Sequence, residues 1–346
     1  MKIGAVILIM LLVLAVPAYA DTYTAPELRG NAQALMPYEG ASFGEGLWHV
    51  ITTAFSYVYP SIDSCLRTCY TALAMCILIS VIREFPGNIS DAVDLAGVIG
   101  AACILFAPTN ALITEAADTV VSLAEYGKVL LPVLATSLAA QGGSSTATGL
   151  YVGTAVFNSV LGVLISRILV PLVYFFLAIG VGKAAISSTV LDNMKKFLIS
   201  AAGKCLRIAL YIITGYLSIT GVVGGATDQI TLKATKLTIS GMVPVIGNIM
   251  ADASETILVS AAVVKNAVGV YGLWSAVAIC IGPFLNIGAQ YWSLKATQSI
   301  CTLCGSKQIP DLIGDFASAM GLLLAMTGTM CLLLLISTVC FMKGIG

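Results

Sequence analysis

Long apolar segments separated by short polar stretches fill most of this chain. The clearest of them, residues 316–342, contains no charged residue, and roughly 20 helical residues are enough to cross a bilayer core about 30 Å thick. Counted generously, the pattern predicts nine spans, at 62–82, 94–108, 110–140, 149–165, 168–186, 206–225, 242–272, 274–291 and 316–342. The segment at 94–108 is short and the one at 110–140 is charged. We therefore predict an all-α, polytopic integral membrane helical bundle of six to nine spans.

The beginning of the chain follows a different pattern. An apolar run after Lys2, closed by Ala18-x-Ala20, predicts a secretory signal peptide, with an uncleaved membrane anchor as the alternative. Residues 46–60 mix aromatic with polar side chains, which is typical of a helix in the headgroup layer. The predicted parts are a signal peptide at 1–20, a short extracytoplasmic segment with an interfacial helix at 21–60, and a multi-pass membrane domain at 61–346.

One apolar stretch, residues 240–272, carries several polar side chains. At about 100° per residue, Asp252, Glu255 and Asn266 fall within roughly 60° of one another, while Lys265 points to nearly the opposite side. A charged side chain at membrane depth costs about 3 to above 10 kcal/mol, so such residues face protein or water. The polar face is predicted to line a pore or an interhelical seam; the alternative is a helix pair that satisfies its own polar groups.

A second polar face lies within residues 110–140. Glu115, Asp118, Ser122 and Glu125 follow one another in steps of three or four residues, which places all four on one side of a helix. One interpretation is a surface helix with its acidic face in water. The other is that this face lines a conduit together with Asp252 and Glu255.

The middle of the chain predicts a close helix pair and a surface helix. Arg167 divides the segments 149–165 and 168–186, and Gly149-x-x-x-Gly153 permits close helix contact. Residues 191–207 form a basic amphipathic helix, which the positive-inside rule places at the cytoplasmic membrane surface or against a cytoplasmic partner. Its basic residues include Lys195 and Lys196.

Composition narrows the function classes. The chain is 58% hydrophobic and 10% charged with zero net charge, which indicates a membrane protein and argues against binding nucleic acid through a basic surface. His49 is the single histidine, so sites with two histidine ligands are excluded, and there is no P-loop motif. We predict a non-enzymatic protein with no cofactor and no metal.

Ten cysteines are present, and most lie in apolar segments, where cysteine acts as a small hydrophobic residue. Cys301-x-x-Cys304 is the exception, because it lies in a polar stretch. One C-x-x-C is half a zinc site, and no second half exists. The pair is a candidate for a disulfide or thiol exchange, and a plain loop is the alternative.

Three motifs carry a resemblance to a known family. V-P-V-I-G at 243–247, A-D-A-S-E-T at 251–256 and V-K-N-A-V-G-V at 264–270 resemble stage III sporulation protein AE of endospore-forming bacteria, and the closing hydrophobic helix fits it too. The resemblance implies a subunit of a secretion-like channel complex in the mother-cell membrane around the forespore. Its implied partners are other stage III sporulation membrane proteins of the same operon and stage II sporulation protein Q. From the residues alone, a stand-alone secondary transporter for a small solute is the alternative.

Overall fold

The computed structural model describes residues 43–83, 90–186, 188–242, 247–304 and 308–343. The predicted signal peptide at 1–20 lies outside the described residues. Within them the chain is almost wholly helical and contains no strand, which confirms the all-α prediction. The helices are α2 (Phe43–Arg83), α3 (Ser90–Ala140), α4 (Ser144–Leu164), the π-helical turn η2 (Ile165–Leu169), α5 (Val170–Ile186), α6 (Thr189–Met242), α7 (Gly247–Cys301), the 3₁₀ turn η3 (Thr302–Cys304) and α8 (Gln308–Lys343).

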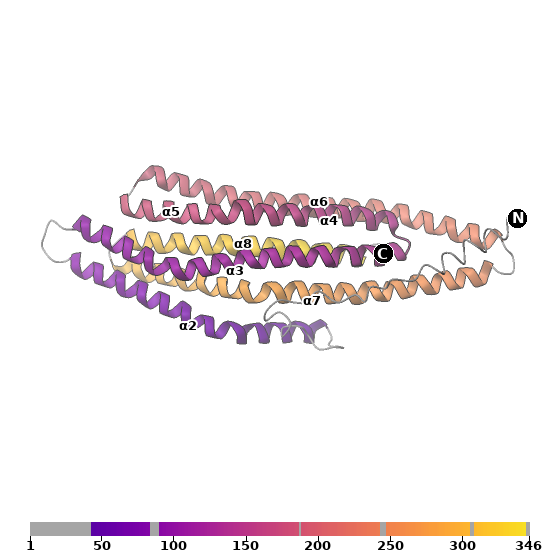
Figure 1. Ribbon diagram of the computed structural model, residues 1–346, viewed down its shortest axis with the longest axis horizontal. Helices are drawn as coiled ribbons and strands as arrows, with labels where there is room; N and C mark the ends of the chain where they lie inside the picture. The colour runs from indigo at the N-terminus through magenta and orange to yellow at the C-terminus, as the bar shows by residue number, and fades with distance from the viewer. Residues whose placement is uncertain (1–42, 84–89, 187, 243–246, 305–307, 344–346) are drawn as a thin grey trace.

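The helices form an elongated bundle in which successive rods run antiparallel (Figure 1). Helix α8 is the central rod: it packs against α3, α5, α6 and α7, and it is the most buried of the candidate spans. Helix α2 packs on the outside, against α3 and α7. The central position of α8 follows from its composition, because residues 316–342 carry no charge and can be covered on all sides without burying unpaired charge.

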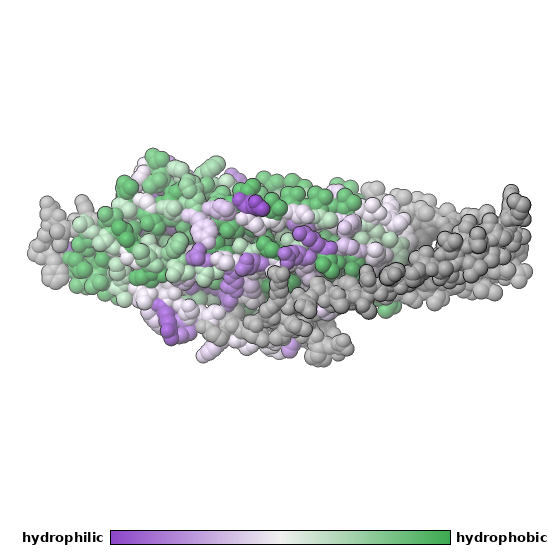
Figure 2. All heavy atoms as spheres, viewed as in Figure 1, coloured by the Kyte–Doolittle hydropathy of each residue, from purple (hydrophilic) through white to green (hydrophobic). Residues whose placement is uncertain are grey.

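Six helical segments of the described chain are long and apolar enough to cross a membrane. This number lies within the predicted range of six to nine. The segments are Ser61–Arg83, Ala92–Ala140, Ser144–Ile186, Thr189–Thr220, Asn266–Cys301 and Gln308–Lys343. Figure 2 shows a largely apolar face, as contact with lipid requires, with hydrophilic residues gathered near the middle of the bundle.

The number of candidate spans falls from nine in the sequence to six in the described structure, because neighbouring predicted segments join into single helices. The segments at 94–108 and 110–140 are both parts of α3, which continues through Pro108 and Pro132. Proline removes one backbone hydrogen bond, and in a bundle the neighbouring helices hold the chain straight enough to continue.

The predicted pair divided by Arg167 is also one rod. Helices α4 and α5 are joined through η2, so Arg167 lies inside a continuous helical run rather than in a turn. Pro171 follows two residues after η2. Since Pro171 cannot donate a backbone hydrogen bond, we attribute the wider π turn before it to this proline.

The helix predicted at 191–207 is not a separate helix. It forms the first part of α6, which runs on without a break through the predicted span at 206–225 and packs against α8. Helices α3 and α4 are joined by a turn of three residues, in which Gly142 takes a φ of 88° that favours glycine. The helix predicted at 46–60 is continuous with the first span in α2.

The G-x-x-x-G prediction at Gly149 and Gly153 is confirmed. A Cβ atom added to Gly153 would lie 1.9 Å from the ring of Tyr216, so the tyrosine occupies the space that glycine leaves. The Tyr216 hydroxyl donates a hydrogen bond of 2.9 Å to the carbonyl oxygen of Gly149. The two glycines therefore bring α4 and α6 into close contact.

Candidate functional site

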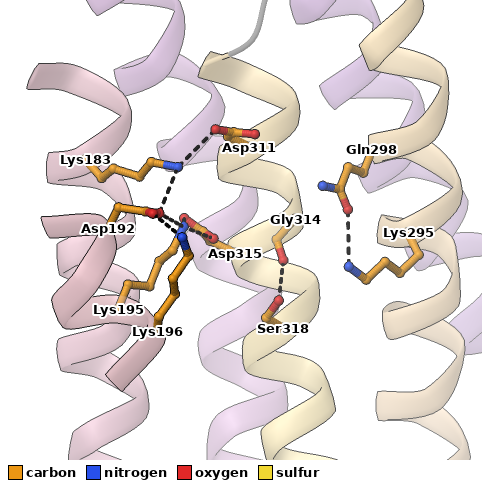
Figure 3. Close-up of polar contacts among 10 residues, drawn as sticks. All are labelled: Lys183, Asp192, Lys195, Lys196, Lys295, Gln298, Asp311, Gly314, Asp315 and Ser318. Carbon is orange, nitrogen blue, oxygen red and sulfur yellow. Dashed lines mark hydrogen bonds and ion pairs between the residues drawn. The ribbon is translucent and has the colours of Figure 1, made fainter. Parts of the chain in front are cut away.

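A network of ion pairs joins α5, α6 and α8 at the end of the bundle where α8 begins (Figure 3). Asp192 in the first turn of α6 lies at its centre. Its carboxylate oxygens are 3.3 Å from Nζ of Lys183, 3.7 Å from Nζ of Lys195 and 2.6 Å from Nζ of Lys196. One carboxylate therefore connects a lysine of α5 with two lysines of its own helix.

The same network contains two acids of α8. The Nζ atom of Lys195 donates hydrogen bonds of 2.6 and 2.9 Å to the two carboxylate oxygens of Asp315, and Lys183 donates one of 3.0 Å to Asp311. The side chains of Lys195 and Asp315 are only 11% and 9% exposed. Gly180 of α5 makes room for Asp315, because a Cβ atom there would lie 3.0 Å from Oδ2.

The network is neutral, with three lysines and three aspartates, and each of these charges has an opposite partner within 4.0 Å. Charges in a membrane-spanning region are tolerated when they pair with one another in this way. The network can fasten the α5–α6 hairpin to the central helix and fix the register of the three helices.

Sequence reasoning missed this network and assigned its lysines differently. Lys195 and Lys196 were predicted to be cations at a membrane surface, and the structure corrects this for Lys195, which is buried against α8. Lys196 is 71% exposed, as predicted for a surface cation. The sequence feature that could have indicated the network is the i, i+4 pair Asp311 and Asp315 at the start of an apolar helix, since buried acids require basic partners.

The predicted acidic face on α3 divides into two parts. Glu115 is half-buried and its Oε1 accepts a hydrogen bond of 3.0 Å from Nδ2 of Asn286 on α7. Asp118 and Glu125 are exposed. The face therefore meets a neighbouring helix at Glu115 and turns outward at the other two acids.

The predicted polar face of residues 240–272 lies in the first part of α7, which together with α6 extends past the ends of α3 and α8 (Figure 1). The side chains of Asp252, Glu255 and Lys265 lie outside the described residues, and Asn266 is exposed. Along α7, Glu255 precedes Asn286 by 31 residues, which is about 46 Å of helix. The structure therefore does not bring Asp252 and Glu255 to the level of Glu115.

The cysteine pair lies at the end of α7. Cys301 is fully buried, and its carbonyl oxygen is 3.8 Å from the thiol of Cys76 on α2. Cys304 ends η3, and its side chain lies outside the described residues. A disulfide or thiol exchange between Cys301 and Cys304 stays a prediction.

Comparison with known proteins gives a family match over nearly the whole chain. The sequence model described as stage III sporulation protein AE matches residues 39–344. Stage III sporulation protein AE of Bacillus subtilis (strain 168) is 23% identical over 248 residues, which are 70% of this chain and 61% of that protein. The matched part thus spans about three fifths of that relative's length. No solved structure matches the chain.

Proposed function

This chain belongs to the stage III sporulation protein AE family, and on that premise we propose that it is a membrane subunit of a transenvelope, secretion-like channel complex between mother cell and forespore. The complex is needed for endospore formation. The observation that carries the proposal is the extent of the family match, because residues 39–344 include every described helix. The proposed location is the mother-cell membrane surrounding the forespore.

The architecture supports a role as a membrane subunit. Six candidate spans give the chain a large lipid-facing surface, and the ion-pair network holds the α5–α6 hairpin against the central helix. A bundle fixed in this way offers a stable surface on which other membrane proteins can assemble. The proposed partners are the other stage III sporulation membrane proteins of the same operon and stage II sporulation protein Q.

The proposed role is non-enzymatic. A G-x-S-x-G spacing occurs once at 40–44, but the nucleophile elbow with this spacing belongs to folds built on a β-sheet, and the described part of the chain is helical with no strand. His49, the single histidine, is half-buried in α2 within the described residues. The charges of the ion-pair network already serve one another as partners.

Purification from sporulating cells tests the proposal. The full chain, tagged and expressed from its own promoter in its endospore-forming host, is solubilised from sporulating and from vegetative cells. We expect the operon's other membrane proteins and stage II sporulation protein Q to copurify from the sporulating cells. Deleting the gene is expected to block spore formation, and the tagged chain is expected to restore it.

The transporter alternative predicts a different result. A chain that purifies alone and supports solute uptake when reconstituted into liposomes would contradict the proposed complex. The same holds if a deletion strain forms spores at the normal yield. The Lys196→Met variant serves as a control in both assays. It removes an exposed charge of the network and leaves the buried pair in place, so it should copurify and form spores as the wild type does.

A further inference from the structure

The contact between α3 and α7 contains a carboxylate that pairs with no basic side chain of the described residues. Glu115 lies inside the candidate span Ala92–Ala140, and its one described contact through the side chain is the hydrogen bond from Asn286. Among the described residues, no lysine or arginine lies within 4.0 Å of this carboxylate. A half-buried acid in a span requires compensation by protein, water or an ion.

Among the described residues, two buried polar atoms of α7 have no hydrogen-bond partner, and one of them belongs to the residue that contacts Glu115. They are Oδ1 of Asn286 and Nε2 of Gln290. Gln290 is 98% buried, since only 2% of its surface is exposed, and it lies one turn from Asn286 on the same side of α7. Buried polar atoms are almost always satisfied, so an unpaired oxygen and an unpaired N–H at neighbouring positions indicate a small polar ligand between the helices.

Proline in α7 adds a backbone oxygen to the same region. Pro283 has no N–H, so the carbonyl of Ile279 lacks its usual helical partner. Helices α3 and α7 are antiparallel, and Glu115 contacts Asn286. Ser122, seven residues after Glu115, therefore lies level with Ile279, seven residues before Asn286. An open space adjoins α7 here, because a Cβ atom added to Gly282 would meet nothing within 4 Å.

These groups form what we call the α3–α7 seam: Glu115, Asp118 and Ser122 of α3 with Ile279, Asn286 and Gln290 of α7. Its acceptors are oxygen atoms of carboxylate, amide, hydroxyl and backbone carbonyl groups, which are the ligands of hard cations. Backbone carbonyls that lack a helical hydrogen-bond partner also coordinate Na⁺ in membrane transporters. The exposed Asp118, one turn from Glu115, stands where a cation would enter.

We propose that the α3–α7 seam binds a small monovalent cation of the class of Na⁺, with the Glu115 carboxylate and the Asn286 carbonyl as its principal ligands. A water molecule that stays bound to the ion accepts a hydrogen bond from Nε2 of Gln290. A single half-buried carboxylate balances one positive charge. In the described part of the chain, no group of three or more histidine, cysteine or acidic residues gathers as a multivalent metal site would require. The site does not depend on which complex the chain joins.

Equilibrium binding of radioactive Na⁺ to the full chain in lipid nanodiscs tests the proposal, with choline chloride holding the ionic strength constant at neutral pH. We expect saturable binding to the wild type, and an affinity lower by about tenfold or more in Glu115→Gln and in Asn286→Leu. Asp63→Asn is the matched control, because Asp63 is an exposed acid on α2 that pairs with Arg67 at 3.0 Å, and it should bind Na⁺ as the wild type does.

The inference would be overturned by the absence of saturable Na⁺ binding in the wild type, or by wild-type affinity in Glu115→Gln. Glu115→Asp keeps a carboxylate and should retain more of the affinity than Glu115→Gln does. This comparison separates loss of a ligand from loss of folding. A wild type whose melting temperature responds to pH but not to Na⁺ would also contradict a site for a metal cation.

Discussion

Replacing Lys195 by methionine should destabilise the bundle strongly. The substitution keeps most of the side-chain volume and leaves Asp315, only 9% exposed, without the ammonium group that now lies 2.6 Å from Oδ1. Removing one partner of a buried pair leaves an uncompensated charge, which typically costs about 3–5 kcal/mol. We expect the free energy of unfolding to fall by about this amount.

Unfolding by titration with sodium dodecyl sulfate in mixed micelles, followed by tryptophan fluorescence, measures the effect. Trp274 is buried in α7 and reports on the packed state. Lys196→Met is the control at the adjacent position: this side chain is 71% exposed, so its loss should leave the stability close to that of the wild type.

A double variant completes the test. Lys195→Met combined with Asp315→Leu removes both buried charges and replaces them with apolar groups, so most of the lost stability should return. The difference between the double variant and the sum of the single ones gives the coupling energy. If Lys195→Met unfolds like the wild type, Asp315 is not desolvated and the reasoning about the network is refuted.

Two further predictions concern helix packing and the extended part of α7. Gly153→Leu should destabilise the contact of α4 with Tyr216 by about 1–3 kcal/mol in the same assay, while Gly215→Ala, with nothing within 4 Å, should be tolerated; equal effects would contradict the packing role. Asp252→Asn combined with Glu255→Gln should lower spore yield while the complex still copurifies, and an unchanged yield would remove the predicted polar face from the mechanism.

The apolar pattern of the chain was sufficient to predict its class and many of its elements. A segment of 27 residues without charge, 316–342, predicts a membrane-spanning helix, and this segment lies within α8. The close helix contact at Gly149 and Gly153 was also predictable, because glycine leaves the space on α4 that side chains of α6 fill. The family resemblance in residues 243–270 was equally visible in the sequence and is confirmed by the family match.

Helix boundaries were less predictable, for a physical reason. Pro108, Arg167 and the polar residues after Gly225 are all signals that end helices in isolated segments. In the bundle Pro108 and Arg167 lie inside α3 and η2, because the alternative to a helical hydrogen bond in an apolar environment is an unsatisfied backbone group. The last part of α6, after Gly225, stays helical where it extends past the ends of α3 and α8 (Figure 1).

What the sequence determined by itself is that this chain must be helical and must enter a membrane, since its apolar segments leave no other way to satisfy their backbone. What only the tertiary structure decided is which polar residues meet. Periodicity places Lys195 on a face of its helix but cannot show that Asp315, 120 residues later, covers that face. The same holds for Glu115 and Asn286, which are 171 residues apart and become neighbours only when α3 packs against α7.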